Sequence, residues 1–168
     1  NSDPDASIYW LVRMLEAGED PLYIVRRMVR FASEDIGLAD PYAVTRAISA
    51  LEAFQLIGLP EGALTLAQLA VDLAMTPKSN SIYRAYQLAQ QDVKNKRLEP
   101  VPLQLRNAPT SLMKDLGYGD NYEYAHNAPG GLTRMACLPE NLDGVRYYVP
   151  TERGKEQEYK KRLEALFR

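Results

Sequence analysis

The stretch GALTLAQLAVDLAM, residues 62–75, decides the fold class of this chain. Drawn as a helix, this segment carries apolar side chains on almost every side, and only Thr65, Gln68 and Asp72 interrupt them. A helix that is apolar nearly all round has to bury most of its surface, so it belongs in the middle of a helical bundle. The chain has 168 residues, enough for a domain that buries its own core without a metal or a disulfide.

Further helices are predicted on both sides of this segment, so that residues 2–96 contain about five. Asp20-Pro21 and Asp40-Pro41 each join a carboxylate that can cap a helix to a proline whose φ is already helical. The helix after Pro21 is expected to end near residue 31 or 32, and its two apolar stripes imply contact on two sides. The sequence therefore predicts an all-α fold, with a helical bundle in residues 1–98.

Residues 99–168 differ in character from the bundle. Their first part is expected to be extended and largely irregular, because prolines disfavour helix there. A short helix is predicted at 112–116, a short strand at 145–149, and a charged helix at 151–168 with Tyr159, Leu163 and Leu166 on one face. We expect this part to wrap around the bundle and pack on the same domain. Its prolines before the short helix are Pro100, Pro102 and Pro109.

The composition excludes several classes of function. The net charge of −2 supplies no general attraction for nucleic acid, although a local basic patch remains possible. One histidine and one cysteine exclude the usual zinc clusters, and a single cysteine fits a reducing cytosol. Gly154-Lys155 lacks the upstream glycine of a phosphate-binding loop, so a glycine at a helix start is the better interpretation. We assign no catalytic, cofactor-binding or metal-binding residue, and we expect no membrane association.

Two groups of residues are candidate contacts with DNA or with a protein interface. In the first group, three arginines on the predicted second helix could bind phosphates, but ion pairs or a solvated face are favoured because the charges balance. In the second, an Arg-Asn pair between prolines could hold the extended segment to the bundle, and two tyrosines could stack on bases or pack at an interface. The candidates are Arg26, Arg27, Arg30, Arg106, Asn107, Tyr118 and Tyr122.

Four blocks of sequence resemble one known family. They are SDPDASIYWLVRMLEAGEDPLYIVRRMVRFASEDIGLADP (2–41), MTPKSNSIYRA (75–85), VPLQLRNAPTSLMKDLGYGDNYEYAH (101–126) and YYVPTERGKE (147–156). In this order they resemble the C-terminal region of the replication-associated recombination protein A family (RarA, also called MgsA), whose eukaryotic relatives are the Werner helicase-interacting proteins. The resemblance covers essentially the whole chain.

This resemblance implies an activity and an assembly, which the composition does not indicate. Members of the family are AAA+ ATPases of the clamp-loader clade that act at stalled replication forks and hydrolyse ATP in a DNA-dependent way. The resemblance implies a clamp-loader-collar-like bundle that assembles a homotetramer. It also implies that ATP and Mg bind in an upstream core. The chain starts without Met and looks like a fragment, and we expect it to have no enzyme activity of its own.

The resemblance also implies partners and a location. DNA would be bound by the full-length protein, a replisome protein such as single-strand-binding protein is a further candidate partner, and the location would be the bacterial cytoplasm at the nucleoid. The alternative interpretation is a module of the same ATPase that contacts DNA or a replisome protein.

Overall fold

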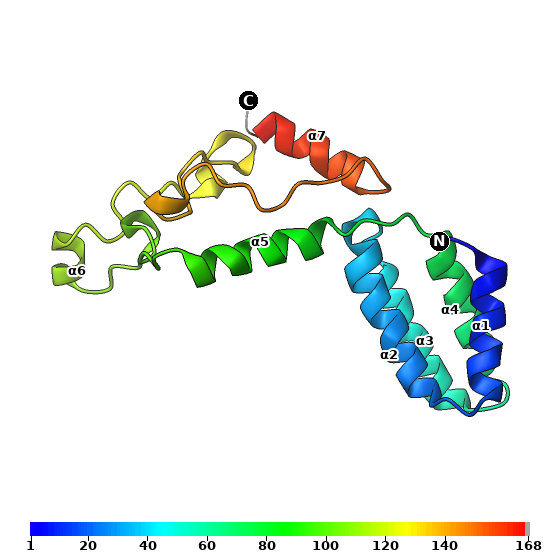
Figure 1. The fold of residues 1–168 in the computed structure, drawn as a ribbon. Helices are drawn as coiled ribbons and strands as arrows, with labels where there is room; N and C mark the ends of the chain where they lie inside the picture. The colour runs from blue at the N-terminus through cyan, green and yellow to red at the C-terminus, as the bar shows by residue number, and fades with distance from the viewer. Residues whose placement is uncertain (167–168) are drawn as a thin grey trace. The chain divides into compact units, whose positions relative to one another are not determined.

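The fold is all-helical, as the sequence predicts (Figure 1). The computed structural model describes residues 1–166, and positions 167 and 168 of the expected C-terminal helix lie outside the described residues. No strand occurs within the described part of the chain. The α-helices are α1 (Pro4–Glu16), α2 (Pro21–Phe31), α3 (Ala43–Ile57), α4 (Ala63–Met75), α5 (Ser81–Asn95), α6 (Ser111–Asp115) and α7 (Glu156–Leu166).

The contacts within the chain divide it into two compact units. The first unit contains residues 1–87 together with the C-terminal stretch that begins at Tyr148, and the second contains residues 88–147. Helix α5 thus begins in the first unit and ends in the second. The boundary expected after residue 98 falls inside the second unit.

Aspartates start the first two helices as the sequence predicts. Asp3 Oδ1 accepts a hydrogen bond from the Ala6 amide at 2.9 Å, and Asp20 Oδ1 accepts one from the Leu22 amide at 2.9 Å. In both cases the next residue is a proline at the first helical position, where no amide hydrogen is needed. Asp40 caps a turn instead, accepting from the Tyr42 amide at 3.0 Å, and α3 follows at Ala43.

Helix α4 lies at the centre of the first unit. It packs against α1, α2 and α3, and five of its side chains are buried. Leu64 and Met75 are exposed at the ends of α4, and Gln68 is exposed in its middle. The prediction of a central helix is therefore confirmed for the body of α4. Its buried residues are Leu66, Leu69, Ala70, Leu73 and Ala74.

Helix α2 also buries two faces, and it ends in an unusual way. Ile24 and Val25 are buried against one cluster of the core, while Met28 and Val29 contact both core clusters. The chain then continues as a π-helical turn, Ala32–Ile36, whose Ala32 and Ile36 are fully buried. The predicted end near residue 31 or 32 is confirmed for the α-helix, and the added turn carries the chain on toward Gly37.

The predicted strand at residues 145–149 is wrong. A strand needs a neighbouring strand for its backbone groups, and the described residues provide none. The tyrosines of this segment instead use their hydroxyl groups: Tyr147 donates to Asp92 at 2.9 Å, and Tyr148 donates to Glu156 at 3.1 Å. The weak alternation of side chains thus reflects two tyrosines that make separate hydrogen bonds, and it does not indicate a sheet.

Candidate functional site

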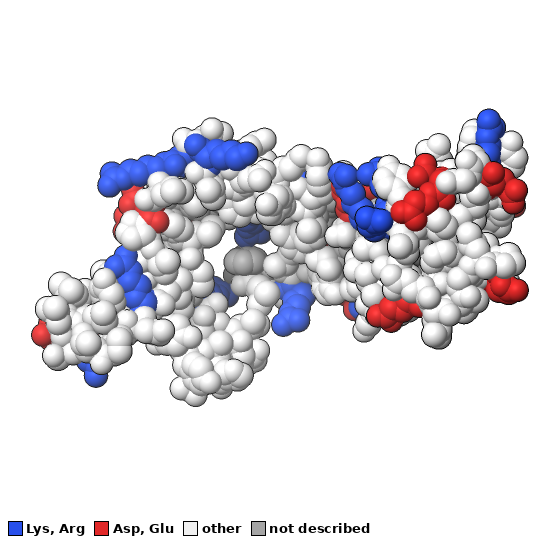
Figure 2. Space-filling view, turned by 90° about the horizontal axis from the view of Figure 1, so that it is seen from below, with Lys and Arg blue, Asp and Glu red and all other residues white. Residues whose placement is uncertain are grey.

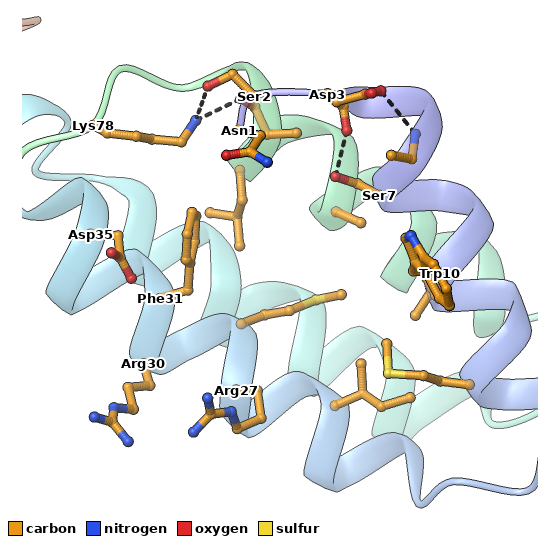
Figure 3. A pocket seen from close by; sticks show the side chains of 18 of the residues that line it. Asn1, Ser2, Asp3, Ser7, Trp10, Arg27, Arg30, Phe31, Asp35 and Lys78 are labelled. Atoms are coloured by element: carbon orange, nitrogen blue, oxygen red, sulfur yellow. Dashed lines mark hydrogen bonds between the residues drawn. The ribbon is translucent and has the colours of Figure 1, made fainter.

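A groove of the first unit lies between α1 and α2, and we call it the α1–α2 groove (Figure 3). Its volume is about 790 Å³. Helix α1 packs on α4 and α2 packs on α3, so the two outer helices diverge and leave the side of α4 open between them. The small side chains Ala70 and Ala74 of α4 lie at the floor and keep the groove open. The walls come from Ser7, Trp10, Leu11 and Met14 of α1 and from Tyr23, Ile24, Arg27, Met28 and Phe31 of α2.

The α1 side of this groove carries exposed aromatic surface. Trp10 is 54% exposed, and its ring meets that of Tyr9 edge to face at a centroid distance of 5.4 Å. The guanidinium of Arg13 lies over the Trp10 ring, 5.1 Å from its centroid. A half-exposed tryptophan beside a groove is a common anchor of protein interfaces, because it offers a large rigid surface at a small loss of side-chain freedom.

Lys78 lines the groove next to the start of the chain and makes several polar contacts there. Its Nζ donates to the carbonyl oxygens of Ala74 and Thr76, both at 2.6 Å, and to Ser2 Oγ at 3.0 Å. Burial lowers the pKa of Lys78 from its ordinary value. The ammonium therefore pairs with carbonyl groups at the C-terminal end of α4 and holds Ser2, at the start of the chain, in place.

The three candidate arginines of α2 differ in their surroundings. Arg26 lies 3.4 Å from Asp20, and Arg30 lies 2.7 Å from Glu34, so both have the ion-pair partners that the sequence favoured. Arg27 lies at the rim of the groove, where Figure 3 shows it projecting from α2 next to Arg30. It makes no ion pair with the described residues 1–166.

The second unit brings Arg106 and Tyr118 together. Arg106 donates from Nε to the Val101 carbonyl at 2.6 Å and from Nη1 to the Tyr118 hydroxyl at 3.1 Å, with its guanidinium 5.0 Å from the ring centroid. Val101 and Tyr118 belong to the same stretch of the second unit as Arg106, so these contacts hold that stretch together. Asn107 and Tyr122 are exposed.

A polar site that the sequence did not indicate lies in the first unit. The carboxylate of Glu156, at the start of α7, is 0% exposed. It accepts hydrogen bonds from Ser79 Oγ at 2.6 Å, from Ser81 Oγ, from Tyr148 Oη at 3.1 Å, and from the amide and Oγ1 of Thr151 at 2.8 and 2.6 Å. Burial alone would raise the pKa of Glu156, but the hydrogen bonds outweigh burial, and the pKa lies below its ordinary value.

The turn before α7 explains the Gly154-Lys155 pair. Gly154 has φ of +52°, and a side chain there would overlap the carbonyl oxygen of Ala39. That same oxygen accepts a hydrogen bond from the Lys155 amide at 2.8 Å. The glycine therefore serves close backbone packing at a helix start, as the sequence predicts. The block YYVPTERGKE contains Tyr148, Thr151, Gly154 and Glu156, so the resemblance was the only signal that could have marked this site.

Residues 1–166 contain neither a side-chain cluster suited to a metal nor a helix suited to a membrane. No cluster of three or more His, Cys, Asp or Glu side chains that could hold a metal occurs among them. In the same part of the chain, no helix is both long and apolar enough to cross a membrane.

Fold and groove together define the class: an all-α domain with an open, largely apolar groove and exposed aromatic residues on its rim. The family model described as MgsA AAA+ ATPase C terminal matches residues 1–167. The chain belongs to this family of C-terminal domains of MgsA AAA+ ATPases, and the resemblance drawn from the four sequence blocks is confirmed.

Individual relatives agree with the family. The chain is 52% identical to replication-associated recombination protein A of Coxiella burnetii over 97% of its own length and 37% of that protein. It is 46% identical to the protein of the same name from Escherichia coli K12, over 92% of the chain and 35% of the relative. It is 52% identical to ATPase WRNIP1 of Dictyostelium discoideum, over 88% of the chain and 17% of the relative. The chain thus spans about a third of the length of its bacterial relatives.

Proposed function

We propose that this chain is the oligomerisation module of a DNA-dependent AAA+ ATPase that acts at stalled replication forks. The observation that supports it most is the apolar surface that the first unit leaves exposed. Leu56 and Leu64, which flank the turn between α3 and α4, are 88% and 76% exposed, and Tyr42 at the other end of α3 is 71% exposed. Apolar residues gathered on the surface of a folded unit mark interaction sites, because burying them against a partner removes them from water. The α1–α2 groove adds a concave surface of the same character.

The assembly that we propose is a homotetramer, in a protein whose ATP and Mg site lies in the part of the relatives that this chain does not cover. The names of the relatives, an ATPase and a replication-associated recombination protein, support an ATPase of this class. DNA is then bound by the full-length protein in the bacterial cytoplasm at the nucleoid, with single-strand-binding protein as a further partner. The module itself is proposed to hydrolyse no ATP, and turnover by the pure 168-residue chain would contradict this.

Sedimentation velocity of the chain tests the oligomerisation. We expect a species of four times 18.9 kDa at tens of micromolar protein, with dissociation on dilution. A single species of 18.9 kDa at that concentration would overturn the proposed function. Circular dichroism of the same sample provides the control that the chain is folded.

A second candidate function is direct contact with DNA. It is supported by Arg27, which lacks an ion-pair partner among residues 1–166, and by the exposed side chains of Asn107 and Tyr122. The Arg106 guanidinium is already engaged by Val101 and Tyr118, which makes it a weaker candidate for phosphate. Binding of forked DNA by the chain should then weaken steeply with salt, and Arg27→Ala should reduce the slope by about one phosphate contact. No binding at low salt would remove this candidate.

A further inference from the structure

The turn between α3 and α4 is a compact apolar projection of the first unit. We call residues 56–64 the α3–α4 turn. Leu56, Leu59 and Leu64 are 88%, 55% and 76% exposed. The sequence around the turn is almost free of charge: between residues 53 and 71 the only ionisable side chain is Glu61, which is exposed. Figure 2 looks onto the end of the helices that carries this turn, where acidic and basic side chains lie around a mainly uncharged surface.

Backbone contacts hold the turn in this form. The Gly58 amide donates to the Phe54 carbonyl at 2.8 Å, and the Gly62 amide donates to the Gly58 carbonyl at 2.6 Å. A side chain at Gly62 would overlap the Gly58 carbonyl, so the chain reverses as tightly as glycine allows. The exposed leucines are thus presented on a turn that its own backbone hydrogen bonds close.

The α1–α2 groove has the complementary properties. Its floor and walls are largely apolar, its α1 wall carries the exposed Trp10, and its rim carries Arg27, which has no ion-pair partner among the described residues. The groove therefore offers apolar surface with the positive charge of Arg27 at its rim, while Asp3, Asp35 and Lys78 line other parts of it. The α3–α4 turn offers apolar surface around one negative charge, that of Glu61. No residue of the turn lines the groove of its own chain.

We propose that the α3–α4 turn of one copy of this chain occupies the α1–α2 groove of a second copy, with Glu61 facing Arg27. The proposal rests on the oligomerisation proposed above and assigns its contact surfaces. Because a turn meets a groove, the contact is head to tail, and each copy keeps one free turn and one free groove for further copies. Repeated around an axis, such a contact closes into a ring, and a ring of four copies requires no other kind of interface.

Two variants of the 168-residue chain separate the surfaces. Leu64→Glu damages the turn and keeps the groove, whereas Arg27→Glu damages the groove and keeps the turn. Both positions are exposed, so each variant should fold and melt like the wild type. We expect each variant alone to raise the Kd of self-association at least about tenfold. Mixed in equal amounts, they should form a dimer, because one intact turn then meets one intact groove.

A charge reversal tests the pairing of Glu61 with Arg27. Glu61→Arg alone should weaken assembly, and the double variant with Arg27→Glu should recover most of it. Leu98→Glu, at another exposed leucine outside both surfaces, is the matched control and should assemble like the wild type.

The outcomes distinguish this proposal from the proposed function. A wild-type monomer would overturn the oligomerisation and this contact together. A wild-type oligomer that persists in both Leu64→Glu and Arg27→Glu would overturn only the contact proposed here. Loss of assembly in each variant without a dimer on mixing would show that like surfaces meet like, which would overturn the head-to-tail arrangement.

Discussion

Replacing the buried carboxylate of Glu156 should release α7 from the rest of the first unit. In Glu156→Ala, Ser79 and Ser81, which are 2% and 4% exposed, lose their acceptor in a site that water does not reach. Hydrogen bonds to a charged group contribute about 1.5–3 kcal/mol each and are not additive. Counting only the two buried serines, we expect a loss of about 3–5 kcal/mol. Tyr148 and Thr151 are partly exposed, so water can replace part of the hydrogen bonding that their hydroxyl groups lose.

Hydrogen exchange followed by mass spectrometry measures this loss where it occurs. Amides of residues 148–166 should exchange about a hundredfold or more faster in Glu156→Ala, since 1.4 kcal/mol corresponds to a factor of ten, while amides of α4 change little. Glu158→Ala is the control, because that side chain lies exposed on the same helix and pairs with Lys155. Unchanged exchange in Glu156→Ala would refute the reasoning that this carboxylate anchors the helix.

The depressed pKa of Glu156 also predicts a dependence on pH. Its folded pKa lies below the ordinary value, so the carboxylate contributes its full stabilisation above the unfolded pKa of about 4.3. This contribution is lost as the pH falls through the folded value. Protection of residues 148–166 should therefore be constant near neutral pH and decrease below about pH 4. In Glu156→Gln the decrease should be absent, and an equally steep decrease would assign it to another group.

Three further variants test other contacts. Arg46→Ala removes ion pairs to Asp40 at 2.7 Å and Asp72 at 2.8 Å. Because the side chain is 37% exposed, we expect the free energy of unfolding to fall by about 1–2 kcal/mol, seen as a melting temperature lower by several degrees. An unchanged melting temperature would mean that water replaces both partners. Gly154→Ala should destabilise the chain by at least about 1 kcal/mol, because the residue has a positive φ and no room for a side chain; wild-type stability in urea denaturation would contradict the observed packing. Arg106→Ala should speed hydrogen exchange in residues 101–118 and leave the first unit unchanged, and unaltered exchange there would return this arginine to the candidate DNA contacts.

Helix positions were predictable because their signals are local. Asp3 and Asp20 cap helices within three residues of themselves, and the prolines that follow them need no distant partner. Thr110 likewise accepts from the Met113 amide at 3.3 Å and starts α6 where the sequence predicts a helix. The failed strand at residues 145–149 shows the opposite case, since a strand depends on a neighbour that the segment itself cannot supply.

The groove and the candidate contacts were predictable only in part. The two stripes of α2 indicate that it has neighbours on two sides, and Ile24 and Val25 are buried accordingly. Which arginine keeps an ion-pair partner depends on geometry: Arg30 reaches Glu34 one turn away, while Arg27, three positions earlier, projects at the rim of the groove. The opening between α1 and α2 follows from which helix each packs against, and no periodicity within either helix contains that information.

By itself, the sequence determined the helical class, the central position of α4 and the family, because apolar periodicity, capping residues and the order of sequence blocks are properties of the chain read along its length. Only the tertiary structure decided that Glu156 meets Ser79 and Ser81, more than seventy positions earlier, and that the α1–α2 groove stays open. The physical reason is that burial changes what a residue does. A glutamate at the start of a charged helix is ordinarily solvated, and it becomes an anchor only when folding surrounds it with hydroxyl groups and excludes water.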